Sequence, residues 1–174
     1  MTGNHEVYLS LGTNIEREHY LRRGLDALQE QFGNLDVSSV YESDAVGFEG
    51  DPFFNLVTRF HTRIPLRDVI ATVKQIESDN DRVRGEEKFA PRTLDIDILT
   101  FDHLTGTHEQ LELPRQEILE QGYVLAPFAE IAPDFVLPGT ATSLSGLWET
   151  SDRKDQVMIV EFYWQGRKLP IFDL

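Results

Sequence analysis

Apolar residues recur with two different periods along the first hundred positions. Three stretches have the alternating or β-branched and aromatic composition that predicts strands, at residues 6–11, 36–42 and 53–64. Two other stretches place apolar residues three or four positions apart, which predicts amphipathic helices over residues 15–32 and 65–80.

A fourth strand, predicted at residues 94–101, completes the order β-α-β-β-α-β. This order is typical of the ferredoxin-like α+β fold, an antiparallel sheet with its helices on one face. We therefore expect the other face to be open for an active site. Further along, the pattern predicts short C-terminal helices at residues 123–133 and 143–149 and a late strand at residues 157–164.

The length of the chain predicts one domain. The 174 residues suit a single core, and no linker divides them, so we expect one domain over residues 1–174. The tail, residues 150–174, contains an apolar run that predicts either an added edge strand or an oligomer contact. The sequence does not choose between these two interpretations.

Charge narrows the class of partner. The chain has 16 basic and 30 acidic residues, a net charge of −14, which disfavours binding to nucleic acid but does not exclude a nucleotide held by a few clustered arginines. It has no cysteine, so it offers no disulfide, thiolate ligand or cysteine nucleophile. It also has no membrane-spanning apolar run of about 18 residues and no signal-peptide pattern. We expect a cytoplasmic monomer.

The sequence "APRTLDIDILTFD" at residues 90–102 contains the most informative chemistry. Asp95 and Asp97 interrupt an apolar strand, and the two-residue period places both carboxylates on one face, roughly 6.6 Å apart along the strand. Carboxylate pairs suit Mg²⁺, which also takes substrate phosphates as ligands. The alternative is a pair of carboxylates that is salt-bridged to Arg82 or Arg92 in the preceding loop.

Aromatic residues suggest a second binding surface. Phe53, Phe54 and Tyr123 could stack on a planar heterocycle while Asn55 bonds its edge. Ordinary core packing is the alternative, and composition alone favours it.

These motifs together resemble the 6-hydroxymethyl-7,8-dihydropterin pyrophosphokinase family over about residues 6–137. The most specific piece is "RVRGEEKFAPRTLDIDIL" at residues 82–99. Supporting pieces are "SLGTN" (10–14), "SSVYES" (38–43), "FFN" (53–55), "QIE" (75–77) and "YVLAPFAEIAP" (123–133). The resemblance implies one pyrophosphokinase-like domain with the ferredoxin-like fold, although the tail at 150–174 has no clear counterpart in the family.

The resemblance implies an enzyme of folate biosynthesis that transfers diphosphate from ATP to the pterin hydroxymethyl group and releases AMP. By this resemblance Asp95 and Asp97 hold two Mg²⁺ ions and act in catalysis with Arg82 and Arg92. The implied contacts to ATP are Glu77, Arg82, Arg84, Arg92, Ile98 and Arg115. The implied contacts to the pterin are Ser43, Val46, Phe53, Asn55 and Tyr123.

The chain departs from the family pattern in its nucleotide site. Arg115 and Gln121 stand where the family has His and Arg, and Gln116 replaces a proline. A divergent paralogue with another phosphoryl donor or acceptor is therefore an alternative, as is a non-catalytic pterin- or nucleotide-binding protein. A two-metal nuclease is disfavoured by the net charge.

Overall fold

The computed structural model describes residues 4–45, 50–81 and 93–174. Within these residues the main sheet has the strand order β11-β2-β4-β1-β5, with β3 and β8 joined to β4 through β3. Its strands are β1 (His5–Thr13), β2 (Asp36–Val37), β3 (Val40–Ser43), β4 (Phe53–Thr62), β5 (Asp95–Phe101), β8 (Val157–Val160) and β11 (Ile171–Phe172). All the pairings are antiparallel.

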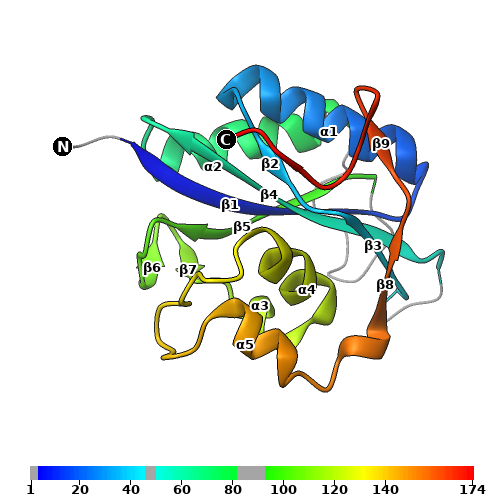
Figure 1. Ribbon diagram of the computed structural model, residues 1–174. Helices are drawn as coiled ribbons and strands as arrows, with labels where there is room; N and C mark the ends of the chain where they lie inside the picture. The colour runs from blue at the N-terminus through cyan, green and yellow to red at the C-terminus, as the bar shows by residue number, and fades with distance from the viewer. Residues whose placement is uncertain (1–3, 46–49, 82–92) are drawn as a thin grey trace.

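The ferredoxin-like fold predicted from the sequence is confirmed. Helices α1 (Arg17–Phe32) and α2 (Leu66–Asp79) cover one face of the sheet (Figure 1). Their apolar stripes pack on alternate sheet residues, among them Leu9, Leu11 and Leu56, in one buried cluster. Because side chains alternate across a strand, the residues between these point to the opposite face.

That opposite face is only partly open. Helix α4 (Gly122–Ile131) packs against β4, with the short helices α3 (Glu117–Glu120) and α5 (Leu144–Glu149) beside it (Figure 1). Tyr8, Val57 and Leu99 of the sheet join Phe128 and other residues of α4 in a second buried cluster. The open part of this face is therefore smaller than the sequence predicts, because α4 covers the rest. The open part lies next to the N-terminal end of α4.

The strand predicted at residues 36–42 is divided into β2 and β3 by two serines. The Ser38 hydroxyl accepts a hydrogen bond from the Val57 N–H at 2.9 Å. The N–H and hydroxyl of Ser39 both donate to the Glu130 carboxylate, each at 2.7 Å. Side chains that bond to the backbone in this way compete with the strand ladder, and here they interrupt it.

The C-terminal tail completes the sheet. β8 pairs with β3 and β11 pairs with β2, so the tail supplies the outermost strands at this edge of the sheet. Between them a hairpin of β9 (Tyr163–Trp164) and β10 (Arg167–Lys168) reaches α1, where the buried Trp164 donates to Asp26 at 2.8 Å. The late strand predicted at 157–164 is thus two strands.

Three small elements complete the described residues. They are β6 (Gly106–His108), β7 (Leu111–Leu113) and the 3₁₀ turn η1 (Lys154–Gln156). No helix in the described ranges is long and apolar enough to cross a bilayer.

Candidate active site

The two carboxylates of β5 lie side by side on the site face of the sheet. Asp95 is opposite Gly12 of β1, and Asp97 is opposite Ser10. Both side chains are partly buried, whereas Ile96 between them points into the core under α2. The sequence-based prediction of a shared face is therefore confirmed.

Glu77 of α2 fixes the strand between these carboxylates. It is 4% exposed, and one carboxylate oxygen accepts a hydrogen bond from the Ile96 N–H at 2.8 Å. The resemblance stated above implies that Glu77 and the backbone at Ile98 contact the nucleoside. The Ile98 side chain is buried at 5% exposure, so only its backbone could serve a ligand.

Arg115 is the cation next to Asp97. Its Nη2 lies 3.3 Å from Asp97 Oδ1, and its Nε donates to Glu117 Oε1 at 2.8 Å. The backbone N–H of Arg115 donates to the Leu99 carbonyl at 2.9 Å, which docks this segment along β5. A salt bridge therefore exists at the pair, but through a residue that the sequence analysis placed at ATP.

The electrostatics of the pair favour an added cation. Burial and the Asp95 charge together raise the pKa of Asp97 to about 8, although Arg115 opposes both effects. A divalent cation at the pair would offset these charges and displace the proton, because carboxylates bind metals in the deprotonated form.

A donor set of two partly buried carboxylates suits magnesium. Among the described residues no three carboxylate, imidazole or thiolate groups converge on one point. Mg²⁺ commonly binds through one or two carboxylates and completes its shell with water and substrate phosphates. The residues present therefore fit it.

Asn55 continues the same row of the sheet toward β3. The partners run from Tyr41 of β3 to Asn55 of β4, to Gly12 of β1 and to Asp95 of β5. Asn55 Nδ2 donates to the Ser43 hydroxyl at 2.8 Å and to the Tyr41 carbonyl at 3.1 Å. Its Oδ1 is thereby directed toward Gly12, as an acceptor on the site face.

Gly12 keeps space between Asn55 and Asp95. A Cβ at this position would lie 3.4 Å from Asn55 Oδ1 and 3.7 Å from the Phe53 ring. The sequence pattern predicts Gly12 only as the end of a strand. A glycine within a strand can mark a close approach of a ligand, and this was the available signal.

Tyr123 belongs to the same electrostatic neighbourhood. Burial, together with the nearby charges of Glu117, Asp97 and Asp95, raises its pKa to about 12. It begins α4 beside Gly122, where a Cβ would lie 2.9 Å from the Arg153 carbonyl. The tail thus supports the turn that carries Tyr123.

Gln116, which departs from the family pattern beside Arg115, lies on the exposed side of α3, where its amide donates to Glu120 at 2.8 Å. Arg82, Arg84, Arg92 and Val46 lie outside the described residues. Glu117 was missed by the sequence analysis, and its position two residues after Arg115 was the only hint.

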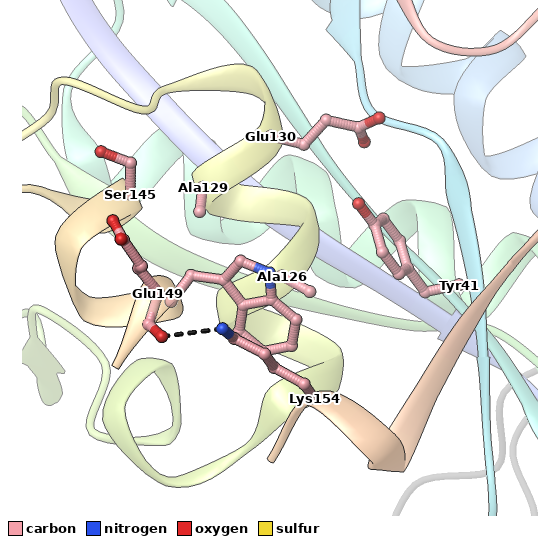
Figure 2. Close-up of a pocket in the computed structure, with 8 residues that line it drawn as sticks. Tyr41, Ala126, Ala129, Glu130, Ser145, Glu149 and Lys154 are labelled. Atoms are coloured by element: carbon pink, nitrogen blue, oxygen red, sulfur yellow. Dashed lines mark hydrogen bonds between the residues drawn. The ribbon is translucent and has the colours of Figure 1, made fainter. Parts of the chain in front are cut away.

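A separate pocket of about 350 Å³ lies between α4, α5, η1 and β3 (Figure 2). The residues that line it are Tyr41, Ala126, Ala129, Glu130, Ser145, Trp148, Glu149 and Lys154. Figure 2 shows Lys154, whose Nζ donates to the Glu149 carbonyl at 2.7 Å. Burial is the main cause of the raised pKa of Tyr41, and the nearby Glu130 charge adds to it. The pocket includes neither carboxylate of β5.

Comparison with known proteins places this geometry in a family. Residues 8–133 match the family described as 7,8-dihydro-6-hydroxymethylpterin-pyrophosphokinase (HPPK). A Bacillus subtilis protein named 2-amino-4-hydroxy-6-hydroxymethyldihydropteridine pyrophosphokinase is 38% identical over 132 residues, which cover 74% of this chain and 78% of that protein. The Dictyostelium discoideum folic acid synthesis protein FOL1 is 33% identical over 138 residues, or 78% of this chain and 21% of that protein.

The fold of the whole chain also has a match. A Plasmodium falciparum HPPK-DHPS triple mutant superposes with a TM-score of 0.74 at 13% sequence identity, covering 97% of this chain and 49% of that one. The present chain thus spans most of the bacterial relative, about a fifth of FOL1 and about half of the Plasmodium chain.

Proposed function

Because the chain belongs to the 7,8-dihydro-6-hydroxymethylpterin-pyrophosphokinase family, we propose that it is an ATP-dependent diphosphotransferase of folate synthesis. In the proposed reaction the hydroxymethyl oxygen of 6-hydroxymethyl-7,8-dihydropterin bonds to the β-phosphorus of ATP. The bond from that phosphorus to the oxygen bridging the α-phosphate breaks, AMP leaves, and the hydroxyl proton passes to water.

One observation carries this proposal, the continuous row Asn55–Gly12–Asp95 across the sheet. Asn55 on β4 can accept a hydrogen bond from the edge of a heterocycle. Asp95, two strands away on β5, is suited to a metal–phosphate complex. Neighbouring strands lie about 4.8 Å apart, so the two ends of the row are about 10 Å apart. A pterin and a triphosphate placed end to end would fit that separation.

Asp95 and Asp97 are the proposed magnesium ligands, for two ions. Bound Mg²⁺ neutralises charge on the triphosphate and orients its oxygens. Arg115 lies close enough to contribute a fixed positive charge to the phosphates, because its guanidinium already contacts Asp97. Arg82, Arg84 and Arg92 remain the proposed phosphate ligands of the preceding loop.

The proposed pterin site is formed by Phe53, Asn55 and Tyr123. The Asn55 amide nitrogen is occupied by β3, so its Oδ1 accepts from a donor on the heterocycle. The Ser43 hydroxyl is used by Asn55, and Ser43 itself ends β3 between β4 and β8. Backbone groups near Ser43 and Val46 remain the other proposed pterin contacts. The proposed nucleoside contacts are Glu77 and the Ile98 backbone.

We further propose a cytoplasmic location and small-molecule substrates, and no nucleic acid, consistent with the charge of −14.

A divergent paralogue is the second candidate. The observation in its favour is Arg115 at Asp97, because a guanidinium stays charged where the family's histidine would titrate. A changed donor or acceptor could use that permanent charge.

The deciding experiment measures AMP formation by the purified protein with Mg²⁺, ATP and the pterin, beside Asp97→Asn. AMP formation by the parent but not by Asp97→Asn supports the proposed reaction. AMP formation that needs another acceptor or nucleotide identifies the paralogue, and pterin binding without turnover identifies a binding protein.

A further inference from the structure

The outer edge of the sheet formed by the tail is unusually apolar. Among the described residues, large hydrophobic side chains that are at least 36% exposed occur at eight positions, and five of these belong to the last 17 residues. The five are Met158, Ile159, Tyr163, Phe172 and Leu174. The other three, Ile15, Leu119 and Val136, are spread over the rest of the fold.

The backbone of this edge is available for pairing. Within the described part of the chain β8 pairs with β3 alone, so its other side has no strand partner. Figure 1 shows the tail running along this side of the molecule from β8 past β9 and back toward β2. Natural edge strands are commonly protected by charges or proline, because an exposed edge is a template for another strand. The sequence Val157–Val160 contains neither.

Charge distribution indicates which partner fits this edge. Residues 150–174 contain four basic and four acidic residues, whereas the remaining 149 contain 12 basic and 26 acidic. The tail is therefore neutral on a molecule whose net charge of −14 lies elsewhere. Two copies that meet at the tail keep their acidic surfaces apart and avoid most of their mutual repulsion.

The β8 edge can serve as both halves of a two-fold contact. In an antiparallel pair about a two-fold axis, the start of one β8 lies near the end of the other, so the same uncharged residues, Val157–Val160, meet twice. An isologous contact of this kind uses the same patch on both copies.

The side chains of β8 alternate between the two faces of the sheet. Ile159, which is 60% exposed, is the strand partner of Tyr41, and Tyr41 forms one wall of the pocket in Figure 2. Met158, 61% exposed, points to the other face beside Glu42. A second β8 would cover both side chains at once.

We propose that the β8 edge is a homodimer interface in which β8 pairs antiparallel with β8 of a second copy, extending the sheet across both chains. The proposal is independent of the catalytic function, because no proposed substrate or metal ligand lies on β8. A dimer of this kind would differ from the monomer expected from the sequence, and the tests below decide between the two.

The first test measures mass against concentration by analytical ultracentrifugation of the full chain. We expect a reversible dimer, and Ile159→Lys should raise its dissociation constant at least tenfold. Val136→Lys, which places the same charge at a 48% exposed valine away from the tail, should leave it unchanged. A parent that stays monomeric up to about 100 μM, where a useful self-association would already be populated, overturns the proposal. A dimer that survives Ile159→Lys overturns it as well.

The second test uses the absence of cysteine from the chain. A single cysteine introduced at Met158 or Ile159 is the only thiol, so a disulfide can form only between copies. Under mild oxidation we expect linked dimers from at least one of these variants, and none above background from Val136→Cys. If all three variants link equally, the thiols meet by random collision and the paired edge is refuted. Circular dichroism and thermal melting confirm that each variant is folded before either test.

Discussion

The Arg115 guanidinium stands 3.3 Å from Asp97 and 2.8 Å from Glu117, between two carboxylates. In the absence of ligands, Arg115 therefore supplies positive charge beside Asp97, where a bound magnesium ion would also supply it. Arg115 lowers the pKa of Asp97 against the effects of burial and Asp95. An internal cation of this kind reduces the negative potential that a metal experiences, and it supplies a contact for phosphate.

We expect Arg115→Met to bind Mn²⁺ or Mg²⁺ about three- to tenfold more tightly without nucleotide, and an ATP analogue more weakly. Removal of one nearby positive charge at partial exposure corresponds to about 1 kcal/mol. Calorimetry of each ligand measures both effects. Arg67→Met, which removes an exposed arginine of α2, is the charge-matched control. If Arg115→Met weakened the binding of both metal and nucleotide, Arg115 would instead support the fold of the site.

Asp97 should also give the metal-free protein a pH-dependent stability. Its pKa of about 8 in the folded state exceeds the value of about 4 expected when unfolded, so the folded protein holds an extra proton between these values. Stability therefore falls as pH rises from about 4 to about 8, and it levels off above that range.

Asp97→Asn should lose nearly all AMP formation and should flatten this part of the profile. Melting temperatures between pH 5 and 9 in chelator, for the parent and the variant, measure the effect. Asp134→Asn, a change at an exposed carboxylate, is the control. Identical slopes for parent and Asp97→Asn would contradict the raised pKa.

The large elements of the fold could be predicted because their hydrophobic periods are long. α1, α2, β1, β4 and β5 each span seven residues or more, enough to define a period. The hairpins β6–β7 and β9–β10 have strands of two or three residues, which define none. Their turns use positive φ angles at Glu109, Gln110, Gln165 and Gly166, and only the last is a residue that signals such a turn.

The site was predictable where its residues share one strand. Asp95 and Asp97 are related by the two-residue period, which is a local property. Arg115 meets Asp97 only because its backbone docks on Leu99, and Gly12 gains meaning only from strand register. Such tertiary relationships leave no periodic trace in the sequence.

The two aromatic residues of the proposed pterin site should be separable from the nucleotide site. We expect Tyr123→Ala and Phe53→Ala to weaken pterin binding by about three- to tenfold or more, since an aromatic contact contributes about 0.5–1.5 kcal/mol beyond its buried area. Binding of an ATP analogue should change less. Calorimetry with each ligand is the measurement, and Phe172→Ala, on the distant β11, is the control. Equal losses for both ligands would indicate damage to packing rather than loss of stacking.

Gly12 gives the sharpest test of the row that joins the two halves of the site. Its added Cβ in Gly12→Ala would meet Asn55 Oδ1 at 3.4 Å and the Phe53 ring at 3.7 Å, distances that the fold can accept. Alanine also suits an extended strand at least as well as glycine does. The variant should therefore melt within a few degrees of the parent. The methyl group nevertheless stands on the site face between Asn55 and Asp95, so we expect pterin affinity and AMP formation to fall at least tenfold. Gly24→Ala is the contrasting change, because its Cβ would lie 3.1 Å from Leu94 in the core under α1 and should lower the melting temperature instead. Full activity in Gly12→Ala would show that no ligand passes over this residue, and the proposed placement of pterin and triphosphate along the row would be wrong.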